Sequence, residues 1–111
     1  TEIMNIYTNN ESKCEVSLKG LYEVLDPEIG LNIVDLGLIY QIDFDESNQH
    51  IELTMTLSTQ FCPMGDSIVS DTKKSLQKSF PAWEIIVHLT FNPVWDFTMI
   101  SEEGREYLGH I

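Results

Sequence analysis

Residues 38–58, LIYQIDFDESNQHIELTMTLS, decide the fold because two alternating apolar segments flank a polar stretch. Side chains of a strand point alternately to its two faces, so each segment predicts a strand with one covered face. The polar residues 45–49 predict a short turn, which makes the pair an antiparallel hairpin. The residues predicted to face inward are Leu38, Tyr40, Ile42, Phe44, Ile51, Leu53, Met55 and Leu57.

A helix is predicted on each side of the hairpin. Upstream, Ser12 and Glu15 form the S-x-x-E pattern of a helix start, and apolar residues at helical spacing predict a helix over residues 12–25. Cys14 lies on its apolar stripe and is interpreted as a buried packing residue. Downstream, the same periodicity predicts a helix over residues 63–79. A proline two positions beyond each predicted end stops both helices.

The rest of the chain adds one more strand and a short final helix. Alternating residues predict a strand over 84–91, and a loop leads to a helical turn that begins near Ser101 and stops at Gly109. The order α-β-β-α-β predicts an α+β two-layer sandwich, in which two helices cover a small mixed sheet of three or four strands. The length predicts a single domain over residues 1–111, with residues 1–11 expected to be a flexible N-terminal segment.

The composition of the chain argues against nucleic acid and membranes as partners. The chain has 18 acidic and 6 basic residues, a net charge of −12, so phosphate backbones would repel it and nucleic acid is not an expected partner. No apolar run approaches the roughly 20 residues that a membrane helix needs. Two cysteines form no disulfide framework, and no secretory signal is apparent, so we expect a cytoplasmic protein with reduced thiols.

The second cysteine, Cys62, occupies an unusual position in TQFCPMGD, residues 59–66. It precedes Pro63, and proline is favoured at the first position of a helix, so Cys62 is predicted to be the helix N-cap. Unpaired N–H groups and the helix dipole there favour the thiolate, which attacks electrophiles and binds soft metals. Cysteine is not a preferred cap, so we interpret Cys62 as a reactive thiolate. The alternative is a small apolar residue packed beneath the loop.

Polar residues near Cys62 define a candidate pocket. Some lie in the same segment, and others in DPEIGLNIVDLG, residues 26–37. For the carboxylates of this second stretch, spacing alone favours turn chemistry over a role facing the thiol. The candidate pocket residues beside Cys62 are Asp26, Glu28, Asp35, Thr59 and Asp66.

Two other kinds of thiol site fit the sequence less well. A Cys–His hydrolase would need a base, and His88, which lies on a predicted strand, is the candidate among the three histidines. Nothing in the sequence places it near Cys62. A closed structural zinc site takes about four Cys or His ligands at short spacings, and the chain has no C-x-x-C.

Three stretches read together resemble the PaaD/SufT family, also called the MIP-eighteen-like family, whose members take part in iron–sulfur protein maturation. They are LDPEIGLNIVDLGLIY (25–40), MTLSTQFCPMGDSI (55–68) and NPVWDFTMISEEGREYLG (92–109). The match runs from about Leu18 to Gly109 with the motifs in the family's order, and it implies the same helix–hairpin–helix–strand fold.

The resemblance also implies roles for individual residues. Cys62 matches the family's reactive cysteine, and Thr59 matches the polar position before it. The other matches are Asp26 and Glu28 in the DPE motif, Asp35 and Gly37 in the D-L-G turn, and Trp95 as the aromatic residue of the C-terminal loop. Two departures are Phe61, where a small residue is common, and the lack of the cysteine-rich extension of phenylacetate-pathway members. The second favours the general maturation branch.

From this resemblance we expect an accessory factor in iron–sulfur protein maturation, with Cys62 as a transient ligand of iron or a cluster. A cluster takes about four thiolates, so no stably bound cofactor is expected. Expected partners are assembly or carrier proteins and apo client proteins, and edge strands with Trp95 make a homodimer plausible. Trp95 packed on the core is as plausible. The alternatives are a thiol-dependent enzyme with Cys62 as nucleophile and a protein-binding adaptor. An assembly role without enzymatic turnover is favoured over the enzyme.

Overall fold

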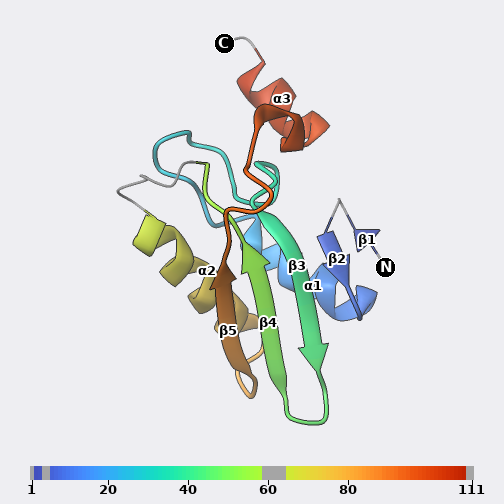
Figure 1. The fold of residues 1–111 in the computed structure, drawn as a ribbon. Coiled ribbons are helices and arrows are strands. Elements are labelled where there is room, and N and C mark those ends of the chain that lie inside the picture. The colour runs from blue at the N-terminus through green and yellow to red at the C-terminus, as the bar shows by residue number, and fades with distance from the viewer. Residues whose placement is uncertain (1, 4–5, 59–64, 110–111) are drawn as a thin grey trace.

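The computed structural model describes residues 2–3, 6–58 and 65–109, which form an α+β fold (Figure 1). The elements in chain order are β1 (Glu2–Ile3), β2 (Ile6–Thr8), α1 (Glu11–Leu21), β3 (Ile39–Asp45), β4 (His50–Met55), α2 (Gly65–Ser79), β5 (Glu84–Leu89), the 3-10 helix η1 (Phe97–Met99) and α3 (Glu102–Leu108). The predicted fold class is confirmed, with the central hairpin, the two covering helices and the short C-terminal helix.

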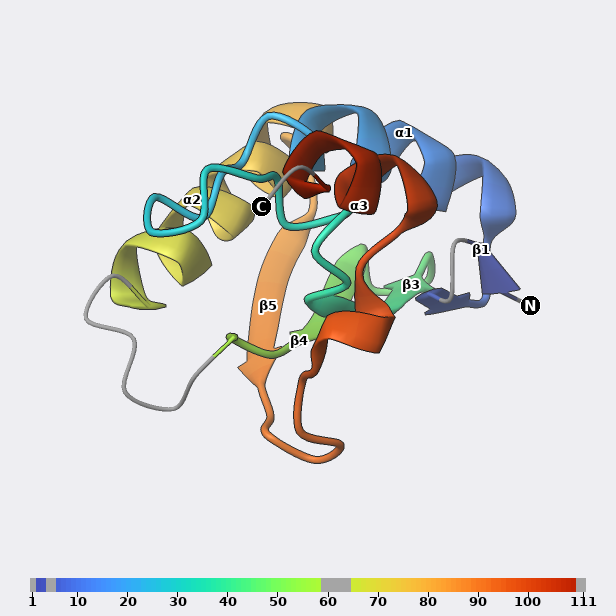
Figure 2. The same cartoon turned by 90° about the horizontal axis from the view of Figure 1, so that it is seen from above.

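The strands lie in the sheet in the order in which they occur in the chain, from β1 to β5. β3 and β4 form the predicted antiparallel hairpin. β2 pairs with β3, and β4 with β5, in parallel, so each of these pairs needs a crossover. α1 and α2 supply the crossovers and cover the same face of the sheet (Figure 2). None of the helices in the described part of the chain is long and apolar enough to cross a membrane.

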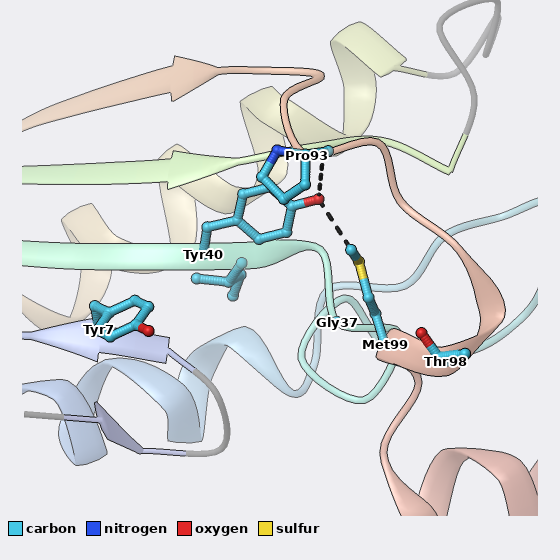
Figure 3. A pocket seen from close by; sticks show the side chains of 7 residues that line it. Tyr7, Gly37, Tyr40, Pro93, Thr98 and Met99 are labelled. Atoms are coloured by element: carbon cyan, nitrogen blue, oxygen red, sulfur yellow. Dashed lines mark hydrogen bonds between the residues drawn. The ribbon is translucent and has the colours of Figure 1, made fainter.

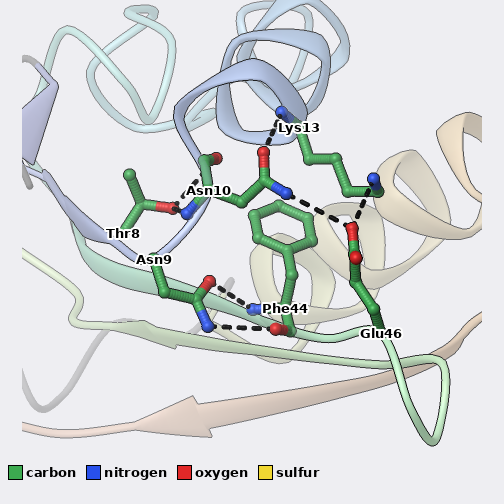
Figure 4. Close-up of polar contacts among 6 residues, drawn as sticks. All are labelled: Thr8, Asn9, Asn10, Lys13, Phe44 and Glu46. Atoms are coloured by element: carbon green, nitrogen blue, oxygen red, sulfur yellow. Dashed lines mark hydrogen bonds and ion pairs between the residues drawn. The ribbon is translucent and has the colours of Figure 1, made fainter.

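The sheet has five strands, more than the three or four that the sequence predicts, because β1 and β2 join the hairpin and β5. These two strands lie within residues 1–11, the segment expected to be flexible. β2 is three residues long, too short to show a readable alternation, yet Ile6 is almost fully buried and Tyr7 aligns with Gln41 of β3. The Asn9 side chain extends this pairing, because it donates to Phe44 O (3.0 Å) and accepts from Phe44 N (2.9 Å) (Figure 4).

The bounds of α1 differ from the predicted 12–25. Asn10 caps the helix, since its Oδ1 accepts from Lys13 N at 3.0 Å (Figure 4), so the S-x-x-E pattern at Ser12 is not the cap. The helix ends at Leu21, and single turns carry the chain onward. Cys14 is buried as predicted, and burial raises the pKa of its thiol.

The core lies between the sheet and the two helices, with one correction on β3. The register shifts between Ile39 and Gln41, which makes Tyr40 the extra residue of a β-bulge. Ile39 therefore takes the inward position predicted for Tyr40, whose side chain is half-buried. The other predicted inward residues of the hairpin are buried, and α2 ends at Ser79 as predicted. The predicted helix start at Pro63 lies outside the described residues.

Candidate functional site

Segments from three distant parts of the chain meet in one groove beyond the end of the sheet, near α3. The groove has a volume of about 510 Å³. One wall comes from residues 28–36, another from the end of the hairpin at Ser58, and the third from residues 95–108. The lining residues are Glu28, Ile29, Leu36, Ser58, Trp95, Phe97, Ile100 and Leu108. Each of the three stretches that carry the family resemblance thus contributes to the same groove.

Asp26 holds the turn that forms the first wall. Its Oδ1 accepts from Glu28 N at 2.9 Å, and its carbonyl oxygen accepts from Gly30 N at 2.7 Å. The side chain is 1% exposed, and among the described residues its Oδ2 is the buried side-chain oxygen or nitrogen that lacks a hydrogen-bond partner. Leaving a buried acceptor unpaired costs free energy, so this carboxylate is maintained at a cost to stability.

Asp35 attaches the C-terminal segment to the second turn. One of its carboxylate oxygens accepts from Ser101 Oγ and the other from Asn32 Nδ2, both at 2.7 Å. Its carbonyl oxygen accepts from Ser101 N, also at 2.7 Å. Ser101 in turn caps α3, accepting from Gly104 N at 3.0 Å. Both Asp35 oxygens therefore accept a structural hydrogen bond, which makes Asp35 a residue that positions the C-terminal segment, and its side chain does not line the groove.

Trp95 forms the third wall and packs against the core, one of the two positions that the sequence left open for it. Its indole Nε1 donates to Leu36 O at 2.6 Å, and its ring is half-buried at the edge of the core. Phe97 stacks edge-on against Trp95, with 5.4 Å between the ring centroids, and is itself 75% exposed. Trp95 thus connects two walls of the groove, while Phe97 is the exposed aromatic side chain of the groove.

The other predicted site residues fall in different places. Cys62 and Thr59 lie outside the described residues. Glu28 lines the groove, and Asp66 is an exposed residue of the first turn of α2. His88 lies on the open face of the sheet, where its Nε2 is 2.8 Å from Glu52 Oε1, and it does not line the groove. Within residues 2–3, 6–58 and 65–109, no three His, Cys, Asp or Glu side chains are grouped to hold a metal ion.

A second cavity, of about 330 Å³, lies on the other side of the C-terminal segment (Figure 3). Tyr7 and Tyr40 flank it, and the Tyr40 hydroxyl donates to Pro93 O at 2.8 Å and contacts Met99 Sδ at 3.7 Å. The bulge on β3 turns Tyr40 toward this cavity. No sequence pattern indicates this cavity, because alternation alone places Tyr40 in the core.

The contrast between Asp35 and Asp26 leads to a prediction on stability. Asp35→Ala removes two good hydrogen bonds to a charged group and is expected to lower the free energy of unfolding by about 2–3 kcal/mol. Asp26→Ala removes one hydrogen bond and one unpaired buried oxygen, so we expect a loss of about 1 kcal/mol or less. Urea unfolding of both variants checks this. A larger loss for Asp26→Ala would contradict the hydrogen-bond assignment.

Comparisons with known proteins agree on one family. Residues 18–85 match the model of a family described as iron–sulfur cluster assembly protein. The Fe-S protein maturation auxiliary factor YitW of Bacillus subtilis is 36% identical over 99 residues, covering 89% of this chain and 96% of that protein. The Fe-S protein maturation auxiliary factor SufT of Staphylococcus aureus is 34% identical over 86 residues, covering 78% and 97%.

A solved structure supports the same relationship. The crystal structure of a domain of unknown function, DUF59, from Bacillus anthracis has a TM-score of 0.79 to this chain and is 39% identical. The likeness covers 86% of this chain and 90% of that one. Sequence and fold thus agree over most of the length.

Proposed function

This chain belongs to the iron–sulfur cluster assembly protein family, and from that premise we propose that it is an accessory factor in the maturation of iron–sulfur proteins. The membership confirms the resemblance of its three motifs to the PaaD/SufT family. Two similar proteins carry the name Fe-S protein maturation auxiliary factor, which supports the role. We further propose that Cys62 is a transient ligand for iron or a cluster during transfer.

The groove supports a role for Cys62 because a groove residue, Ser58, is only a few positions away from Cys62 in the sequence. Ser58 lines the groove, and Cys62 follows it by four positions, so their Cα atoms lie at most about 14 Å apart. On the other side, α2 is described from Gly65, three residues after Cys62. A thiol near the start of a 15-residue helix benefits from the positive end of the helix dipole, which favours the thiolate.

The number of cysteines determines whether this chain alone could hold a cluster. A cluster takes about four thiolates, and this chain has two cysteines. Cys14 is 0% exposed and points into the core, so it cannot share a ligand set with Cys62 without unfolding part of α1. The remaining ligands would then come from assembly or carrier proteins and from the apo client that accepts the metal. The site is thus suited to transfer rather than to storage.

The test is anaerobic reconstitution with ferrous iron and sulfide. We expect thiolate-to-iron charge-transfer absorption in the wild type, loss of nearly all of it in Cys62→Ser, and retention in Cys14→Ala, the matched control. Client maturation in cells should follow the same order. Absorption that persists in Cys62→Ser would overturn the ligand role. Iodoacetamide labelling that shows a lowered Cys62 pKa without metal uptake would favour a thiol-dependent enzyme instead.

One observation favours a second candidate, an adaptor that binds clients or carriers without contacting the metal. Large apolar side chains of the C-terminal segment are exposed, among them Val94, Tyr107 and Phe97, and Phe97 lines the groove. Exposed aromatic residues of this kind are typical of protein contacts. In cells that lack this protein, the Cys62→Ser variant is compared with the wild type for its ability to restore client maturation. If the two restore it equally well, the adaptor function is favoured and the ligand role of Cys62 is overturned.

A further inference from the structure

β5 forms one outer edge of the sheet (Figure 1), and its backbone groups alternate between β4 and the open side. Glu84 N donates to Gln49 O at 2.9 Å, and Thr90 N donates to Met55 O at 2.8 Å. The N–H groups of the even-numbered residues thus point toward β4. The N–H and C=O groups of Ile85 and Val87 consequently point outward, where no described strand pairs with them.

This edge lacks most of the features that usually prevent pairing with another strand. Edge strands are commonly protected by charged side chains, above all lysine, or by proline, a bulge or very short length, and of these β5 has the charged Glu84. β5 is six residues long, contains neither lysine nor proline, and pairs with β4 in an uninterrupted register. The apolar Leu89 at its end is 46% exposed. The opposite edge is different, because β1 has two residues.

The charges on β5 are self-complementary in one antiparallel register. If two copies pair with Ile86 on the two-fold axis, Glu84 of each copy lies directly opposite His88 of the other on the open face of the sheet. Both side chains are at least half exposed there, and within each chain Glu84 lies 3.9 Å from His50 Nε2 while His88 Nε2 lies 2.8 Å from Glu52, so the contact between copies would extend these two in-chain pairs. The register centred on Val87 would place Glu84 opposite Thr90 and leave no such pair. Opposite charges directly across strands stabilise pairing, so the first register is favoured when His88 is protonated.

The first register also fits the backbone. With Ile86 on the axis, Ile85 of one copy faces Val87 of the other. These are the residues whose N–H and C=O groups point outward, so they can exchange both hydrogen bonds of an antiparallel pair. The two Ile86 residues then face each other as a pair without hydrogen bonds, the kind in which side chains come closest.

We propose that the partner at this edge is a second copy of this chain, which pairs antiparallel through β5 with Ile86 on the two-fold axis and joins the two sheets into one. The proposal goes beyond the function proposed above and stands on different observations, so either can fail alone.

Each copy carries a net charge of −12, which opposes association at low salt. Measurements therefore belong at about 0.15 M salt or above, where the Debye length is about 8 Å or less.

The first experiment measures mass by sedimentation equilibrium. The wild type is expected to approach twice the 12.7 kDa of the chain at about 0.5 mM. Ile86→Lys places two ammonium groups directly opposite each other and should weaken association at least about tenfold. Gln41→Lys, the matched control, adds the same charge to the same face but on β3, and should leave the dimer intact. A monomeric wild type, or a dimer that Ile86→Lys leaves unchanged, overturns the proposal.

The second experiment tests the register and does not depend on how well Ile86→Lys folds. In a Cys62→Ser background, Ile86→Cys should form an interchain disulfide under mild oxidation, since Cβ atoms of directly opposed residues lie about 4.5–5.5 Å apart. Glu84→Cys should not, because its two copies would lie about 13 Å apart along the strands. Faster cross-linking of Glu84→Cys than of Ile86→Cys overturns the register and with it the charge pairing.

Discussion

Gly37→Ala is expected to lower the free energy of unfolding by about 3 kcal/mol or more, whereas Gly30→Ala should lower it by about 1–2 kcal/mol. Both glycines have a positive φ, +77° at Gly37 and +80° at Gly30, so an alanine is strained at either position. They differ in their surroundings. A Cβ at Gly37 would overlap the backbone carbonyl of Met99, while a Cβ at Gly30 meets no atom within 4 Å.

The pair of variants separates backbone strain from displacement of the C-terminal segment. Urea unfolding gives the two losses, and their difference measures the clash with Met99. Hydrogen exchange should also show faster opening of residues 97–108 in Gly37→Ala but not in Gly30→Ala, because Met99 belongs to η1. Equal losses and unchanged exchange would mean that the segment does not rest on this turn.

Trp95→Ala is expected to lower the free energy of unfolding by about 3 kcal/mol, since a large ring packed against the core is removed together with its hydrogen bond. Trp95→Phe keeps most of the ring and loses the bond from Nε1 to Leu36 O, so its loss should be about 1–2 kcal/mol. Phe97→Ala is the matched control, because Phe97 is mostly exposed, and it should cost about 0.5 kcal/mol or less.

The same variants bear on the proposed function. Phe97→Ala leaves the groove standing but removes the exposed ring, so a fall in client maturation with unchanged stability would indicate a contact surface at Phe97. Trp95→Ala should reduce client maturation through loss of the groove. A Trp95→Ala protein as stable as the wild type would contradict the packing described for this residue.

Local patterns predicted those parts of the fold that short-range physics determines. The hairpin follows from strict alternation over residues 51–57, and α2 ends at Ser79 because Pro81 follows. The Ser101 cap of α3 was likewise readable from the sequence. β2 was not, because three residues carry no period, and its pairing depends on the distant strand β3.

The site was less predictable for the same reason. The sequence predicts Asp35 as a pocket residue, and the family resemblance adds a turn there, whereas its hydrogen bond to Ser101, 66 residues along the chain, depends on the fold. The bulge that moves Tyr40 out of the core depends on how β3 aligns with β4, which the pattern of β3 alone does not reveal. Asp26 was included for its motif, whereas its distinguishing feature, an unpaired buried oxygen, appears only in three dimensions.

The third wall of the groove has a consequence for how the protein is made. Residues 95–108 emerge from the ribosome after every strand of the sheet, and Trp95 can bond to Leu36 only once that stretch has left the exit tunnel. A nascent chain with its sheet already folded would still lack this wall. The groove is thus completed only after residues 95–108 have left the tunnel, later than the sheet on which it rests.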